Sequence, residues 1–207
     1  AGLLLISTPY SFAANAELTD PSLEQKLDEF LKLNESDNQG SFDFLLALEA
    51  QVNERTPLHS QSRFLCYLAS GYLWRKEVDK AKNYLARAWA LAESSNDPDV
   101  WAEVLATKIE VLRVENDSIA VFEIIDQLVE KSEQAVQERV RYFGMNSAAR
   151  FYAWESKFED ALKLFQLAYQ AIENSTNPRT PIRKMYIKSN IASLNSNLHN
   201  WELALST

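Results

Sequence analysis

The sequence predicts an all-α protein built from stacked helical hairpins. Glycine is scarce, at 4 of 207 residues, whereas a sheet protein of this size would need many more for its turns. Apolar residues recur three and four positions apart, which is the stripe of an amphipathic helix. The same stripe returns forty residues later, and this period predicts a repeating unit of two helices.

The first elements, in residues 17–58, do not fit the forty-residue register. We expect one helix from Asp20 to about Asn34 and a second helix after Gly40 and Ser41. Terminal units of stacked arrays are commonly atypical. Residues 17–58 are therefore predicted to form an atypical helical hairpin that caps the array.

Repeating units follow in residues 59–207. Their predicted bounds are about 60–98, 99–138, 139–178 and 179–207. Asp97 before Pro98 predicts a helix N-terminus, as does Asp117 within a short polar turn. The fourth unit ends inside its expected second helix, so we expect the natural protein to continue beyond Thr207.

Small side chains recur where the two helices of a unit would cross. They are Ala69 and Ala149 in first helices, and Ala81 and Ala161 in second helices. Alanine at such points lets helices approach closely while larger neighbours fill the space beside them. The pattern over residues 60–207 resembles the tetratricopeptide repeat, with its best copy running from Ala148 to Ala168. The resemblance implies a right-handed α-α superhelix, a solenoid whose first helices line a concave face.

Residues 1–16 resemble the remnant of a secretory signal peptide. Gly2 to Ile6 is apolar, and Ala14-Asn15-Ala16 has the small-x-small form of a cleavage site. We expect export to a bacterial periplasm, with an uncleaved N-terminal anchor as the alternative. Long repeats behind such a segment are similar to the extracytoplasmic regions of tetratricopeptide-containing GGDEF proteins. In those proteins the repeats precede a membrane helix and a cytoplasmic diguanylate cyclase.

The ionisable residues argue against several other functions. A net charge of -8 and a pI of about 4.9 disfavour a nucleic-acid partner. Cys66 is the only cysteine, lies in an apolar stretch and is expected to be a buried small side chain. His59 and His199 have no further ligand residues nearby, so we expect no metal site and no cofactor. We also expect no catalytic activity in this segment.

The resemblance places the binding surface on the concave face of the superhelix. Aromatic, arginine and asparagine side chains there offer a large contact area beside charge-assisted hydrogen bonds. The competing interpretation is that the tryptophans pack at helix ends and the charges are solvated. The predicted partner-binding residues are Arg63, Trp74, Glu110, Arg113, Asn146, Arg150, Trp154, Tyr186 and Asn197.

The leading functional hypothesis is a non-catalytic scaffold that binds a protein or peptide in its groove. It would be the sensory or docking region of a longer signalling protein, tethered to the membrane outside this segment. One alternative is a small-ligand sensor that controls a C-terminal diguanylate cyclase or kinase. A second alternative is a self-association module that forms a homodimer.

Overall fold

The computed structural model describes residues 22–34 and 37–198. Two predictions lie outside the described residues: the signal-peptide remnant and the second helix of the fourth unit. The predicted fold class is confirmed as all-α, because the described secondary structure is helical and includes no strand. Within the same ranges, no helix is long and apolar enough to cross a bilayer.

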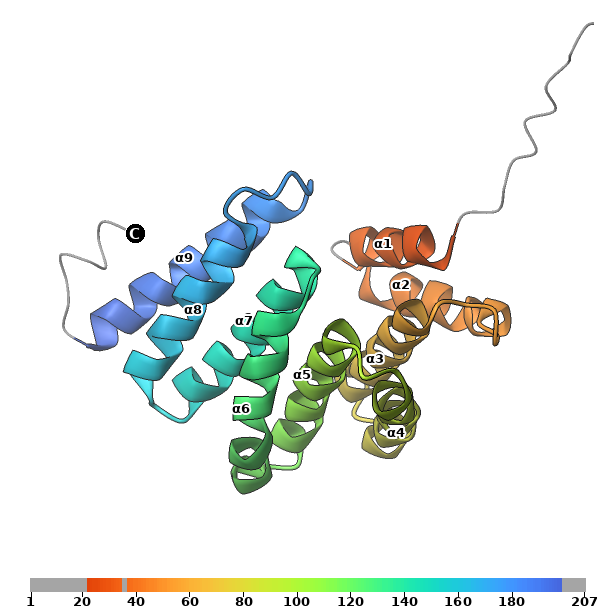
Figure 1. The fold of residues 1–207 in the computed structure, drawn as a ribbon, viewed down its shortest axis with the longest axis horizontal. Coiled ribbons are helices and arrows are strands. Elements are labelled where there is room, and N and C mark those ends of the chain that lie inside the picture. Colours follow the sequence, from red (N-terminus) through yellow and green to blue (C-terminus); the bar gives the residue numbers. More distant parts are fainter. Residues whose placement is uncertain (1–21, 35–36, 199–207) are drawn as a thin grey trace, which may run out of the picture.

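The helices alternate with short turns along the chain. They are α1 (Leu23–Leu33), α2 (Asn38–Ala47), the short 3₁₀ helix η1 (Glu49–Gln51), α3 (Leu58–Trp74), α4 (Val78–Ser95), α5 (Pro98–Val114), α6 (Ser118–Gln134), α7 (Glu138–Trp154), α8 (Phe158–Ile172) and α9 (Thr180–Asn197). Figure 1 shows them side by side in chain order, from α1 at one end to α9 at the other.

Odd-numbered and even-numbered helices pack differently. Helix α5 contacts both α3 and α7, so these three odd-numbered helices form a continuous layer. Each of α4, α6 and α8 packs against the helix before it and the helix after it. Helices α3, α5 and α7 therefore share one side of the molecule, and this layer positions most of the candidate site.

The turn inside each hairpin has the same backbone geometry. Lys76, Asn116 and Ser156 have positive φ angles of 62°, 59° and 60°. The next residue donates its N–H to the carbonyl five positions earlier, at 3.0 Å from Glu77 to Tyr72, 2.9 Å from Asp117 to Leu112 and 2.8 Å from Lys157 to Tyr152. This is the Schellman motif, which satisfies carbonyls left unpaired at a helix end. The forty-residue period is thus present in the backbone as well as in the sequence.

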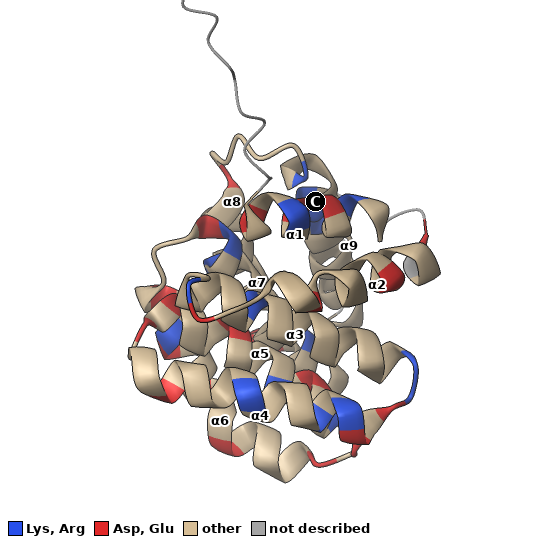
Figure 2. Cartoon of the chain, turned by 90° about the vertical axis from the view of Figure 1, so that its right-hand side faces the viewer, with Lys and Arg blue, Asp and Glu red and all other residues tan. Residues whose placement is uncertain are grey.

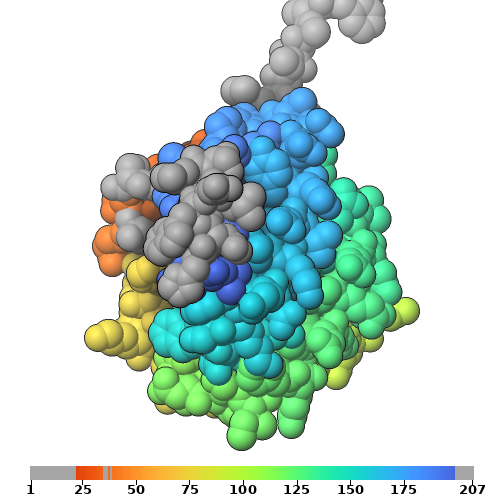
Figure 3. Space-filling view, turned by 90° about the vertical axis from the view of Figure 1, so that its left-hand side faces the viewer, coloured from red at the N-terminus to blue at the C-terminus, as the bar shows by residue number. Residues whose placement is uncertain are grey.

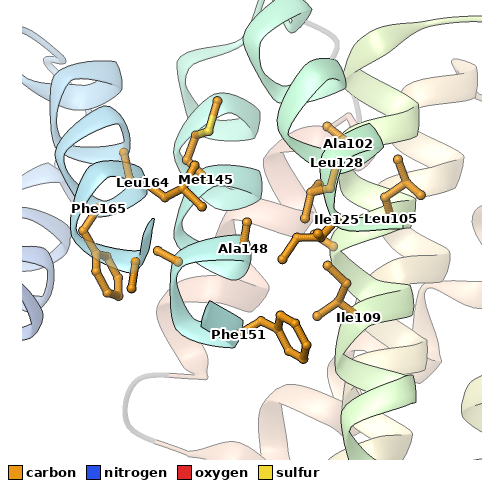
Figure 4. Close-up of a cluster of buried hydrophobic side chains, with 14 of the residues drawn as sticks. Ala102, Leu105, Ile109, Ile125, Leu128, Met145, Ala148, Phe151, Leu164 and Phe165 are labelled. Atoms are coloured by element: carbon orange, nitrogen blue, oxygen red, sulfur yellow. The ribbon is translucent and has the colours of Figure 1, made fainter. Parts of the chain in front are cut away.

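The core positions expected from the repeat are buried. Ala69 and Ala149 of the first helices are 0% exposed, and so are Ala81 and Ala161 of the second helices. Figure 4 shows larger side chains of one buried cluster, among them Ile109, Ile125 and Phe165, together with the small side chains of Ala102 and Ala148. Lys108, at an expected core position, is half-buried with its ammonium 4.2 Å from the ring centre of Trp89.

The N-terminal pair differs from prediction in its boundaries. Helix α1 begins at Leu23, because Ser22 and Gln25 form a capping box in which each side chain accepts from the other's backbone N–H. Helix α2 begins at Asn38 and so includes Gly40 and Ser41, because the Asp37 carboxylate caps the first turn. The predicted caps at Asp97 and Asp117 are confirmed, since each side chain accepts a hydrogen bond from a backbone N–H of the helix that follows.

Candidate functional site

Four predicted binding residues meet on neighbouring odd-numbered helices. Glu110 and Arg113 come from α5, and Arg150 and Trp154 come from α7. Oε2 of Glu110 lies 2.5 Å from Nη1 of Arg113, and Oε1 lies 3.4 Å from Nη1 of Arg150. The Arg113 guanidinium also sits 4.8 Å from the ring centre of Trp154, within cation–π range. The Glu110 carboxylate therefore contacts both arginines, and the Arg113 guanidinium also packs against the Trp154 ring.

A groove opens beside this cluster, between α7 and α9. Its volume is about 400 Å³. We call it the Trp154 groove, and its main lining residues are Arg113, Arg150, Trp154, Phe158, Asn190 and Asn197. A fifth predicted residue, Asn197, thus joins the others from the end of α9. Figure 3 looks onto this end of the molecule, where light-blue α8 fills the centre of the view.

The exposure of Trp154 follows from its place in the repeat. It is the last residue of α7, immediately before the turn, and 68% of its surface is exposed. Trp74 ends α3 in the same way and is 84% exposed, and Val114 ends α5 with 49% exposed. The repeat therefore places one exposed apolar side chain at the end of each of these three helices.

The remaining predicted residues lie apart from this groove. Trp74 lines a separate pocket with Phe42 and Arg75. Tyr186 is exposed on α9, and Asn146 is half-buried on α7. The structure therefore brings five of the nine predicted residues together and leaves these three elsewhere.

Arg63 differs most from its predicted position, because it is buried rather than exposed in a groove. Only 2% of Arg63 is accessible, and its guanidinium is paired with Glu24 and Asp28 of α1. Burial by itself would lower the pKa of Arg63, but Tyr67 and these carboxylates raise it above its ordinary range. The packing of α1 over this part of α3 could not be predicted from the repeat, because the first hairpin does not follow it.

A second, smaller hollow lies among the odd-numbered helices, with a volume of about 120 Å³. We call it the Arg183 cavity. It is lined by residues from five helices, including Leu31, Tyr67, Glu103, Arg139, Tyr142 and Arg183. The sequence prediction missed Arg139 and Arg183. Arg183 lies one helical turn before the predicted residue Tyr186 of the same helix, and this spacing could have identified it.

Charged residues elsewhere are mixed in sign. Figure 2 shows acidic and basic residues interspersed along α4, on the side opposite α9. The described residues include no group of three or more His, Cys, Asp or Glu side chains that could hold a metal ion. Cys66 is buried as predicted, and this burial raises the pKa of its thiol to about 12.

No protein-family model matches this chain, and no curated protein is significantly similar to it. The resemblance to the tetratricopeptide repeat therefore rests on the residues quoted above.

Proposed function

We propose that the chain is a tetratricopeptide-like right-handed superhelix whose odd-numbered helices form the concave face. Three observations support this arrangement. The hairpin turns recur with one geometry every forty residues, the helix-crossing alanines are fully buried, and α3, α5 and α7 pack in one layer. Small, regular steps between such units generate a curved surface suited to binding.

We further propose that this surface binds a protein or peptide partner at the Trp154 groove, without chemistry of its own. The observation that carries the proposal is the exposure of Trp154 beside two arginines, at the edge of a groove of about 400 Å³. Tryptophan and arginine are the residues most enriched among the energetic centres of protein interfaces. Covering the indole would remove a large apolar area from water.

The charges of the cluster indicate the chemistry of the partner. Arg113 and Arg150 share the single carboxylate of Glu110, so these three residues carry one net positive charge. Asn190 and Asn197 add amide donors and acceptors on the opposite wall. The partner segment would therefore present an apolar side chain to Trp154 and an acidic side chain to Arg150. In the longer protein, this segment would act as a periplasmic sensory or docking region.

Affinity capture tests this function. The purified chain, immobilised and exposed to an extract of the cells that make it, should retain specific proteins identified by mass spectrometry. The double variant Trp154→Ala with Arg150→Ala should retain at least about tenfold less of them, because it removes both the apolar and the charged contact. Direct titration of each retained protein against both forms would then measure the loss of affinity.

The matched control is the pair Ile119→Ala with Arg87→Ala. Ile119 is 77% exposed on α6, and Arg87 is exposed on α4, so both changes fall on even-numbered helices. The control should capture the same proteins as the unmodified chain. Equal capture by the unmodified chain and the Trp154 variant would contradict the proposed site.

Self-association is a second candidate function, supported by one face of α9. Ile182, Met185 and Tyr186 are 38%, 57% and 58% exposed and lie within one helical turn. Exposed apolar residues grouped in this way mark interaction surfaces. Light scattering should then give a dimer mass that Met185→Glu with Tyr186→Glu reduces to that of a monomer. A monomeric unmodified chain at high concentration would contradict this candidate.

A further inference from the structure

Arginines outnumber acidic residues among the described residues that line the Arg183 cavity. Arg139, Arg179 and Arg183 all line it, and Glu103 is the one acidic lining residue in the described part of the chain. Arg139 is paired with Glu103, so that carboxylate is already engaged. Arg63, close to the cavity on α3, is likewise engaged by Glu24 and Asp28. These pairs leave no carboxylate for Arg183 among the lining residues that the structure describes.

Arg183 has no counter-charge among the residues that the structure describes. Among residues 22–34 and 37–198, no carboxylate lies within ion-pair distance of its guanidinium, and its recorded interaction is with the ring of Tyr142, 5.2 Å away. Burial lowers the pKa of Arg183, and the positive charges of Arg179 and Arg139 lower it further. A half-buried guanidinium without a counter-charge is unfavourable unless an anion binds beside it.

The cavity walls also restrict the kind of anion. Leu31, Tyr67 and Phe143 give one side an apolar or aromatic surface. A guanidinium presents parallel N–H donors that match the two oxygens of a carboxylate. A volume of about 120 Å³ accommodates a short organic acid but not a folded segment.

We propose that the Arg183 cavity binds a small organic carboxylate, with its oxygens at Arg183 and its apolar body against Leu31 and Phe143. The carboxylate could belong to a free short-chain acid or to an acidic side chain of a bound peptide. The chemistry recognised is the same in both cases. This site is separate from the Trp154 groove and does not depend on the function proposed for that groove.

Calorimetric titration of the full chain at low ionic strength tests the proposal. Butyrate represents the free acid, and N-acetylglutamate amide represents the peptide side chain. At least one of them should bind at a single saturable site, while its uncharged counterpart, butyramide or N-acetylglutamine amide, should not. If butyrate binds, the source is a free acid, and if only the glutamate compound binds, the source is a peptide. Absence of binding by both carboxylates at millimolar concentration would overturn the proposal.

Substitution of Arg183 tests whether the probe binds in the Arg183 cavity. Arg183→Gln should weaken binding of the active probe about tenfold or more, because a charge-assisted pair is lost. Arg183→Lys should give an intermediate affinity, since it keeps the charge but not the paired donors. Arg87→Gln, the same change on exposed α4, should leave binding unaltered. Unchanged affinity in Arg183→Gln would contradict the assignment.

Thermal unfolding without ligand separates a binding role from a structural one. Because Arg183 repels its two arginine neighbours, Arg183→Gln should leave the Tm unchanged or raise it. A structural role would lower the Tm of this variant, and such a result would overturn the inference. The active probe should raise the Tm of the unmodified chain but not that of Arg183→Gln.

Discussion

Lys76 and Ser156, two repeat lengths apart, share the same left-handed backbone conformation, with φ angles of 62° and 60°. Each follows the last turn of an odd-numbered helix, and the next residue donates its N–H back to a tyrosine carbonyl, Tyr72 or Tyr152. Neither lysine nor serine favours this conformation, which glycine adopts at little cost. The turn geometry is therefore imposed by the packing of the hairpin on both sides of it.

Replacing Lys76 or Ser156 with glycine should stabilise the protein. Each change should raise the free energy of unfolding by about 0.5–1 kcal/mol, because glycine removes the steric cost of the left-handed conformation. The two gains should add, since the turns are far apart. Asn116→Gly should gain less, because asparagine tolerates this conformation better. Urea titrations followed by circular dichroism would measure all three.

Ala90→Gly is the control for this prediction. Ala90 is exposed in the interior of α4, where glycine should lower the free energy of unfolding by about 1 kcal/mol. A loss of stability on changing Lys76 or Ser156 to glycine would contradict the turn geometry described here.

Glutamate at a helix crossing should unfold much of the array. Ala149 and Ala161 are 0% exposed, so Ala149→Glu or Ala161→Glu would bury an unpaired charge in a space that fits a methyl group. The expected loss is several kcal/mol, visible as reduced helicity at 25 °C. Ala90→Glu makes the same change on an exposed surface and should alter the free energy of unfolding by less than about 0.5 kcal/mol. If Ala90→Glu lowered the free energy of unfolding as much as Ala149→Glu or Ala161→Glu, the close helix packing at Ala149 and Ala161 would be contradicted.

Removing the carboxylates that pair with Arg63 should lower the free energy of unfolding more than removing Arg63 itself. Changing Glu24 to Gln and Asp28 to Asn leaves a 2% exposed guanidinium without counter-charge, and should cost about 2–3 kcal/mol. Arg63→Met should cost less, because the two partly exposed carboxylates can turn to water. Hydrogen exchange should place the loss of protection mainly in α1. A larger loss in Arg63→Met would show that the pairing itself supplies the stability.

The buried thiol predicts a pH dependence above neutrality. The pKa of Cys66 rises from 9.0 for an exposed thiol to about 12 in the folded chain. Between these values the folded state keeps a proton that the unfolded state has lost, so this thiol makes stability fall as pH rises from about 9 to 12. Cys66→Ala should reduce the slope of stability against pH in that range. An unaltered slope would mean that the folded thiol titrates as an exposed one.

Much of the fold could be predicted from the sequence because the repeat is local. Alanines at fixed offsets identified the helix crossings, and Asp97 and Asp117 identified two helix starts, since a cap depends on a few adjacent residues. Arg113, Arg150 and Trp154 were predicted to share one surface from the forty-residue register together with the resemblance to the tetratricopeptide repeat. These three residues lie close to Glu110 and Asn197 because of the way in which α5, α7 and α9 are arranged.

The features that sequence reasoning missed depend on contacts between distant segments. Arg63 is buried because α1, which does not follow the repeat, brings Glu24 and Asp28 against it. The Arg183 cavity needs residues of five helices, so no single amphipathic stripe could indicate it. Hydrophobic periodicity tells which face of a helix is buried, but it does not tell which charged residue a neighbouring helix will supply.

Site-specific photo-crosslinking in living cells tests most directly whether the Trp154 groove is a binding surface. A photoreactive amino acid would replace Trp154 in one variant and Ile119, on α6, in the other. Both positions are largely exposed, at 68% and 77%, so they sample the cell contents equally well. Position 154 should give a discrete crosslinked product that is absent at position 119. Identical products at both positions, or a product at position 119 alone, would contradict the proposed function.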